Sequence, residues 1–123
     1  MNNTPFLGLR TAIYQVSDMV AATQWYSQLL GMEPYFNEPF YVGFNVGGFE
    51  LGLQPEENPP ASKPLSVATY WGVEDVESTF ARLLSLGAVA YEQPTDVGSG
   101  IVVAAATDPW GNVVGIIKNP HFV

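Results

Sequence analysis

The sequence predicts an α+β fold built from two tandem βαβββ modules, and three observations support this prediction. The first is an internal repeat, because AIYQVSDMVAATQWYSQLLGMEPY resembles ATYWGVEDVESTFARLLSLGAVAY, and the aspartates of their Val-x-Asp motifs, Asp18 and Asp75, correspond. The second is the order of patterns in each copy, in which a short strand precedes a helix and strand-like stretches follow it. The third is a proline-rich segment between the copies, which predicts a linker.

The first copy opens with a strand that ends at Val16, and an amphipathic helix follows it. Ser17 or Asp18 is expected at the helix N-cap, because a short polar side chain there accepts a hydrogen bond from a free backbone N–H. Gly31 is expected to end the helix, because glycine adopts the left-handed conformation without strain. The apolar stripe of the helix is expected to pack on a sheet, and it consists of Met19, Ala22, Trp25, Tyr26 and Leu29.

Three strand-like stretches complete the first copy, namely EPYF, FYVGFNV and FELGLQ, and Gly47 and Gly48 form a turn between the last two. The prolines of the next segment forbid both a helix and a central strand. We therefore expect a single domain over residues 1–123, with a first module of about 8–54, a linker of 55–65 and a second module of about 66–119.

The second copy repeats this order of elements. Glu74 or Asp75 is expected at the N-cap of its helix, Gly87 is expected to end it, and its apolar stripe consists of Val76, Phe80, Leu83 and Leu84. AVAYEQ is expected to form the next strand, and PTDVGSG, residues 94–100, is expected to form a loop. The final hairpin is expected to consist of IVVAAAT, a structural turn over DPWGN, and VVGIIK.

Composition excludes several classes of protein. Hydrophobic residues make up 47% of the 123 residues and charged residues 13%, which excludes a disordered chain and indicates that much of the sheet surface is covered. A second subunit is one means of covering it, so we expect a homodimer. The chain contains no cysteine, which excludes disulfides, thiolate catalysis and zinc held by sulfur.

The balance of charges indicates which partners to expect. The formal net charge of −8 disfavours nucleic acids and anionic membranes and favours neutral or cationic small molecules. The sequence shows neither a charged leader with an apolar core nor an apolar run of about 18 residues. We therefore expect a cytoplasmic protein that binds neither membranes nor nucleic acid.

The WYSQLLGM segment, the DPWGN turn and the Val-x-Asp ending of the first strand of each copy occur in an order and at a spacing typical of one family. With the duplicated βαβββ unit, the chain resembles the glyoxalase, bleomycin-resistance and extradiol-dioxygenase superfamily, also called the vicinal oxygen chelate (VOC) fold. This resemblance implies that the two modules form a curved, cup-shaped mixed sheet with helices on the outer face. It also implies that a small-molecule ligand binds in the cup. We expect the glycine-bearing segment of residues 95–100 to form a mobile flap over the entrance.

Enzymatic members of this superfamily hold a divalent metal with four side chains, and the resemblance assigns these positions to Thr11, Glu50, Ala68 and Gly115. Only Glu50 carries a side chain that is a competent ligand. A strong site needs three or four nitrogen or oxygen ligands in a fixed geometry, so we expect no metal and no other cofactor. The alternative is a divalent metal bound in an unconventional way at Glu50.

Glu50 alternates with the apolar residues Phe49 and Leu51 in the FELGL strand, which by itself indicates a solvated side chain. The resemblance places this face in the cup instead. Burial there is expected to raise the pKa of Glu50, which then serves as a general base or as the anion that captures a cationic ligand.

The resemblance and the same alternation together predict a set of ligand-binding residues. His121 is the third residue from the end of the given sequence and is expected to be a tail residue. The aromatic residues around the second and third strands are expected to form core and subunit contacts, with one or two as a ligand wall. The predicted ligand-binding set consists of Thr11, Ile13, Gln15, Glu50, Ala68, Tyr70, Trp110, Gly115 and Ile117.

Three functions agree with these observations. The first is a metal-independent protein that sequesters a neutral or cationic, partly aromatic molecule, of which antibiotic resistance of the bleomycin type is one instance. The second is an enzyme, a lactoylglutathione-lyase-like lyase, an isomerase or an extradiol dioxygenase, with Glu50 as its catalytic residue. The third is a dimeric interaction module that binds no small molecule.

Overall fold

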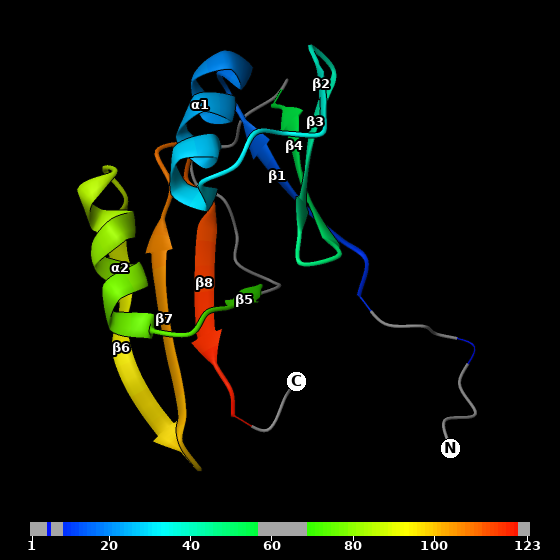
Figure 1. The fold of residues 1–123 in the computed structure, drawn as a ribbon. Coiled ribbons are helices and arrows are strands. Elements are labelled where there is room, and N and C mark those ends of the chain that lie inside the picture. Colours follow the sequence, from blue (N-terminus) through cyan, green and yellow to red (C-terminus); the bar gives the residue numbers. More distant parts are fainter. Residues whose placement is uncertain (1–4, 6–8, 57–68, 121–123) are drawn as a thin grey trace. The chain divides into compact units, whose positions relative to one another are not determined.

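The computed structural model describes residue 5 and residues 9–56 and 69–120 (Figure 1). Contacts within the chain divide it into two compact units, residues 1–55 and 56–123, which are called the first and second modules below. The boundary falls at the start of the expected linker, most of which lies outside the described residues, as do Ala68 and His121.

The first module is a four-stranded sheet with one helix. Its strands lie in the order β1-β4-β3-β2, with β1 parallel to β4 and the other pairs antiparallel. Along the chain its elements are β1 (Thr11–Val16), α1 (Met19–Leu30), β2 (Phe36–Glu38), β3 (Tyr41–Val46) and β4 (Phe49–Pro55).

The second module repeats this topology, with the order β5-β8-β7-β6 and a parallel pair of β5 and β8 (Figure 1). Its elements are β5 (Tyr70–Gly72), α2 (Val76–Ser85), β6 (Val89–Gly98), β7 (Ile101–Thr107) and β8 (Val113–Lys118). The prediction of two tandem βαβββ modules in an α+β fold is therefore confirmed. No helix of the described ranges is long and apolar enough to cross a membrane.

The helices begin at the expected caps. The Asp18 carboxylate accepts a hydrogen bond from the Ala21 N–H at 3.0 Å, and the Asp75 carboxylate accepts one from the Ser78 N–H at 3.1 Å. Gly31 ends α1 with φ 70°, in the left-handed region, and its N–H donates to the Ser27 carbonyl. These local hydrogen bonds define where both helices begin and where α1 ends.

Each helix packs its apolar stripe on one face of its own sheet. In β1 the side chains alternate strictly, so that Tyr14 is buried and stacks on Tyr26 of α1 with ring centroids 5.9 Å apart. In α2 the stripe residues Val76, Phe80 and Leu83 are buried, whereas the fourth expected member, Leu84, is 40% exposed. The buried stripe of α2 is thus narrower than the helical spacing predicted, because it does not include Leu84.

Residues 94–100 do not form the expected loop. Strand β6 continues to Gly98 and pairs with β7, with Thr95 opposite Val103, and only Ser99 and Gly100 connect the two strands. Pro94 lies where the register shifts between Glu92 and Thr95, and β6 is the edge strand of its sheet. A proline without an N–H is tolerated at such a place, which is why the loop signal was misleading.

The DPWGN turn is structural, as expected. Asp108 is 3% exposed, and its carboxylate accepts hydrogen bonds from the Trp110 N–H at 2.9 Å, the Asn112 N–H at 2.8 Å and the Asn112 side-chain amide at 3.0 Å. This carboxylate therefore fixes the turn that leads from β7 into β8.

Candidate functional site

The candidate site lies on the face of the first sheet opposite the buried residues that pack with α1. Thr11, Ile13 and Gln15 alternate with buried residues of β1 and are exposed on this face. The parallel register places Thr11 opposite Glu50 and Ile13 opposite Gly52. The predicted site residues of the first module thus share one face, which we call the open face of the first sheet.

Two tyrosines hold Glu50 on this face. The Tyr35 hydroxyl donates a hydrogen bond to Oε1 of Glu50, and the Tyr41 hydroxyl donates one to Oε2. Tyr35 precedes β2, and its backbone N–H donates to the Gly43 carbonyl at 3.0 Å, which anchors it beside β3. We call Tyr35, Tyr41 and Glu50 the first tyrosine–glutamate cluster.

A pair of glycines makes room for the two rings. Gly43 of β3 lies directly opposite Gly52 of β4. A Cβ atom on Gly52 would come within 3.0 Å of the Tyr41 ring, and one on Gly43 would lie 3.0 Å from Cε1 of Tyr35. Because both positions lack a side chain, the rings lie close against the sheet and their hydroxyls reach the carboxylate.

The cluster sets the charge state of Glu50 in the direction opposite to the one expected. Hydrogen bonds from Tyr35 and then Tyr41 lower the pKa of Glu50, and burial, which opposes this shift, is the weaker influence. Burial and the bond to Glu50 raise the pKa of Tyr41 to about 12, and the bond to Glu50 also raises the pKa of Tyr35. At neutral pH the cluster therefore holds one carboxylate anion and two neutral phenols.

The second sheet carries a hollow of about 330 Å³. The Tyr70 hydroxyl at its edge donates to Oε1 of Glu92 at 3.2 Å, and burial followed by the charge of Glu92 raises the pKa of Tyr70. The hollow is lined by Thr69, Tyr70, Tyr91, Glu92, Ala105, Val113 and Gly115.

Gly115 lies opposite Tyr70 in the parallel pair of β5 and β8. A Cβ atom there would lie 2.7 Å from Cδ1 of Tyr70 and closer still to the Thr69 carbonyl oxygen. The glycine in the middle of β8 therefore makes room for the Tyr70 ring and for the Thr69 carbonyl group.

The strand registers change one predicted correspondence between the modules. Gly52 pairs with Ile13 and Gly115 pairs with Tyr70. Ile13 and Tyr70 are equivalent positions of the repeat, because each precedes the aspartate of its own Val-x-Asp by the same number of positions. The counterpart of Gly115 in the first module is therefore Gly52 and not Glu50, the metal position that the resemblance assigns to the last strand of that module.

The described residues do not fit the metal site of the enzymatic relatives. Thr11 offers a hydroxyl, Gly115 offers no side chain, and both oxygens of Glu50 already accept phenol hydrogen bonds. Within the described ranges, no group of three or more histidines, aspartates or glutamates is close enough together to hold a metal ion. This donor set lacks the three or four ligands that a strong site needs.

The sequence predicted part of this arrangement. Thr11, Ile13, Gln15 and Glu50 lie on one face of the first sheet, and Tyr70 and Gly115 line the hollow of the second. Ile117 is half-buried opposite Gly72, and Trp110 is half-buried in the DPWGN turn. Neither is among the described residues that line the hollow.

Seven residues of the cluster and the hollow were not in the predicted ligand-binding set, although Tyr35 and Tyr41 belong to the aromatic residues of which one or two were expected as a ligand wall. The seven are Tyr35, Tyr41, Thr69, Tyr91, Glu92, Ala105 and Val113. The internal repeat could have pointed to Tyr91. It lies as far beyond Gly87 as Tyr35 lies beyond Gly31, so the two tyrosines occupy equivalent positions.

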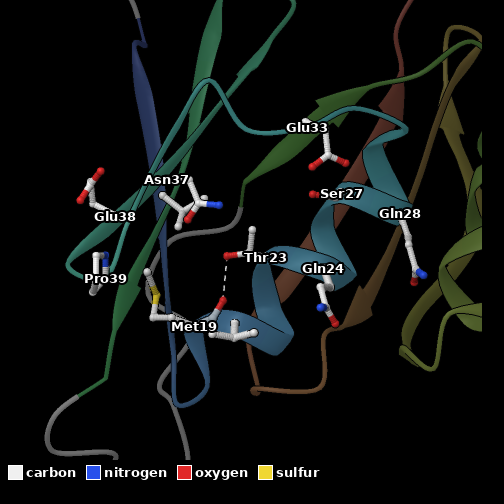
Figure 2. Close-up of a pocket in the computed structure, with 11 residues that line it drawn as sticks. Met19, Thr23, Gln24, Ser27, Gln28, Glu33, Asn37, Glu38 and Pro39 are labelled. Carbon is white, nitrogen blue, oxygen red and sulfur yellow. Dashed lines mark hydrogen bonds between the residues drawn. The ribbon is translucent and has the colours of Figure 1, made fainter.

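A further hollow of about 600 Å³ lies between α1 and the β2 region (Figure 2). Most of the residues that line it are polar, such as Gln24 and Gln28 of α1 and Asn37 and Glu38 of β2, and the others are apolar, such as Val42. The Thr23 hydroxyl donates to the Met19 carbonyl at 2.7 Å and is thus used within the helix (Figure 2). Among its described lining residues, none belongs to the predicted site.

Two four-stranded sheets, each formed by a βαβββ module with its helix on one face, are typical of the vicinal oxygen chelate fold. Residues 8–116 match the family model of the Glyoxalase/Bleomycin resistance protein/Dioxygenase superfamily. The chain belongs to this superfamily.

Individual proteins that resemble this chain share only a minority of its residues. The uncharacterized protein YurT of Bacillus subtilis (strain 168) is 31% identical over 78 residues, which span 58% of this chain and 61% of that protein. A glyoxalase-related enzyme from Fulvimarina pelagi superimposes with a TM-score of 0.75 at 20% identity, covering 94% of this chain and 90% of that chain. Lactoylglutathione lyase from Agrobacterium tumefaciens superimposes with a TM-score of 0.73 at 21% identity, covering 97% of this chain and 100% of that chain. At these identities the solved structures show a shared fold alone.

Proposed function

We propose that this chain is a metal-independent binding protein of the superfamily, which holds a small, partly aromatic, cationic or neutral molecule against the open face of the first sheet. One observation carries the proposal, namely the Glu50 carboxylate held by two tyrosine hydroxyls above a pair of glycines. Such a group is a fixed anion at neutral pH, because the hydrogen bonds lower its pKa.

The cluster retains capacity for a ligand. A carboxylate has about four acceptor positions, and the two phenols use two of them. A ligand ammonium group can donate to the others, and such charge-assisted bonds are stronger than neutral ones. Tyr35 is 63% exposed, so its outer ring face is accessible to a cation, an interaction worth about 0.5–2 kcal/mol.

Neighbouring rings supply an apolar wall for an aromatic part of the ligand. The ring centroid of Phe36 lies 6.0 Å from that of Phe40 and 6.3 Å from that of Tyr41. Phe36 and Phe40 are both exposed, which leaves their surface available to a ligand. The net charge of −8 further favours the approach of cations.

Proton transfer by Glu50 is less well supported than binding. A general base works best when its pKa lies near the working pH, and the pKa of Glu50 is lowered instead. Tyr41, with a pKa of about 12, is a weak acid. These shifts favour sequestration of the drug-resistance kind over the lyase, isomerase or dioxygenase alternatives.

Three ligands that share one ring test the proposal, namely benzylammonium, benzyl alcohol and benzoate. Calorimetric titration should rank their affinities in that order, because only the first is a cation. Glu50→Gln should weaken benzylammonium binding by about tenfold or more, since a hydrogen bond to a charged group contributes about 1.5–3 kcal/mol. Glu33→Gln makes the same charge change in the same module outside the cluster and should leave the affinity unchanged. Equal affinity for benzoate, or an unaffected Glu50→Gln variant, would refute the proposal.

A further inference from the structure

We propose that the hollow between α1 and the β2 region binds a polyhydroxylated aliphatic amine, such as an amino sugar. This hollow has a volume of about 600 Å³, and its described lining residues all belong to the first module. It lies on the face of the first sheet on which α1 packs, which we call the helix face. The inference does not rest on the proposed function, because it concerns other residues, the opposite face and another class of ligand.

The strand registers show on which face the hollow lies. Tyr14 of β1 pairs with Leu53 of β4, and Leu53 pairs with Val42 of β3. Val42 in turn pairs with Asn37 of β2, so the four residues form one row across the sheet. Tyr14 stacks on Tyr26 of α1, which places this row on the helix face. Val42 and Asn37, at the outer end of the row, line the hollow.

The position of α1 leaves space beside these two strands. In the first sheet α1 makes its main contact with β4, whereas α2 packs on β6, β7 and β8 of the second sheet. The helix face of β3 and β2 therefore lies beside α1, and the hollow occupies the space between them. Val42 is buried and lies at its base, and the exposed Asn37 side chain points from β2 toward α1 (Figure 2).

Two rows of α1 side chains form the opposite wall. Residues four apart lie on one face of a helix, so each row runs along the helix axis. The first row is half-buried and the second is exposed, so the wall extends from the base of the hollow to its rim. The first row consists of Met19, Thr23 and Ser27, and the second of Val20, Gln24 and Gln28.

The hydrogen-bonding groups of the hollow match the hydroxyl groups of a polyol. Side-chain amides and serine hydroxyls both donate and accept hydrogen bonds, and so do the hydroxyls of a polyol. An aliphatic polyamine has only N–H donors and would not use the donors of the amides. The hollow is thus suited to a ligand with several hydroxyls, since amides line both of its walls. These groups are the amides of Gln24 and Gln28 on α1 and of Asn37 on β2, and the hydroxyl of Ser27.

The charge and the apolar part of the hollow complete the choice of ligand. Figure 2 shows the Glu33 carboxylate turned toward α1 and the Glu38 carboxylate turned away from it. Glu33 can accept a charge-assisted hydrogen bond from an ammonium group, and the described lining residues include no lysine or arginine that would favour an anion. They also include no aromatic ring, which indicates an aliphatic ligand. The apolar lining residues are Met19, Val20, Pro39 and Val42.

Glucosamine titrated into the isotope-labelled full chain tests this inference by NMR, in a mildly acidic buffer that keeps its amine protonated. The side-chain amide of Asn112, which donates to Asp108 at 3.0 Å in the second module, is the control and its signal should stay constant. Glucose should bind more weakly because it lacks the ammonium group, and glucuronate should bind most weakly because Glu33 repels its carboxylate. The side-chain amide signals that should shift along one saturation curve are those of Gln24, Gln28 and Asn37.

Glu33→Gln should weaken glucosamine binding by about tenfold or more, because it removes the charge that the ammonium group contacts. The affinity for glucose should change little. Glu77→Gln makes the same charge change on α2 and should leave glucosamine binding unchanged. Because Glu33→Gln should also retain its affinity for benzylammonium, each of the two proposals can fail without the other.

Three results would overturn the inference. The first is that the three amide signals in the hollow stay constant, and the second is that glucuronate or putrescine binds as tightly as glucosamine. The third is that these signals shift with protein concentration alone, because a second copy of the chain would then cover the hollow. Should Glu33→Gln fail to fold, the ranking of the sugars on the wild-type chain decides between these outcomes and the expected one.

Discussion

Glycines in both sheets leave space for tyrosine rings, and this is the feature from which the first tyrosine–glutamate cluster and the hollow of the second sheet follow. Gly52 lies under Tyr41, and Gly115 lies under Tyr70 and beside the Thr69 carbonyl. The two cases differ in what a methyl group would meet. At Gly52 it meets only the far end of the Tyr41 side chain, whereas at Gly115 it also meets the backbone.

Alanine substitutions should therefore have graded effects. Gly115→Ala should destabilise the fold by about 1–3 kcal/mol, because overpacking against a fixed backbone forces it to shift. Gly52→Ala should cost less stability but displace Tyr41 from Glu50. Gly72, where an added Cβ meets nothing within 4 Å, is the matched control in β5. Denaturant unfolding measures the three values, and a Gly115→Ala variant as stable as Gly72→Ala would contradict the assignment.

The pKa shifts of the first tyrosine–glutamate cluster make stability depend on pH. Because the pKa of folded Glu50 lies below its ordinary value of 4.5, its contribution is present above pH 4.5 and is lost as the pH falls through the folded pKa. Tyr41 contributes below its ordinary pKa of 10.0 and loses this contribution as the pH rises through about 12.

Carboxyl NMR titration of Glu50 checks this behaviour. A Tyr35→Phe, Tyr41→Phe double variant should return the pKa of Glu50 upward toward 4.5, because both donors are removed while the rings remain. An unchanged pKa in the double variant would show that the two hydroxyls do not hold the carboxylate.

At the scale of elements, the boundaries that depend on local chemistry were predictable from the sequence. The helix caps, the Gly47–Gly48 turn and the Asp108 turn all carry short-range signals, and the structure agrees with each. The extent of β6 was not predictable, because Pro94 and Gly98 resemble loop residues. Pairing with β7 overrides that resemblance.

The N-cap assignments can be tested directly. Asp18→Ala and Asp75→Ala should each destabilise the fold by about 1 kcal/mol, because each leaves an N–H of the first helical turn without its acceptor. Ser17→Ala and Glu74→Ala, at the neighbouring positions that the sequence also allowed, should change the stability by less than about 0.5 kcal/mol. Thermal or denaturant unfolding distinguishes the pairs, and equal losses at neighbouring positions would contradict the capping geometry.

At the scale of the whole molecule, the sequence predicted the superfamily and the duplicated modules but only part of the chemistry. Alternation placed Glu50 and Tyr70 on particular faces of their strands. It did not reveal that Tyr35 and Tyr41 reach Glu50, because that depends on the Gly43–Gly52 pairing across two strands. It also missed Glu92, because the register of β6 shifts between Ala90 and Glu92, and such a bulge changes the face to which a residue points.

Composition still favours a homodimer, since 47% of the residues are hydrophobic and only 13% are charged. Sedimentation equilibrium should therefore give a mass twice that of the chain. A mass equal to that of a single chain at all concentrations would contradict this expectation.

The central claim is that Glu50 binds organic cations as a fixed anion without a metal. Benzylammonium titration of metal-stripped protein, from neutral pH to below pH 4.5 and with Glu50→Gln as the control, tests it most directly, because the lowered pKa keeps the Glu50 carboxylate charged over the upper part of this range. We predict an affinity that stays constant down to pH 4.5, falls only below it and does not respond to added divalent cations. An affinity that falls well above pH 4.5, or that requires a metal, would contradict the account.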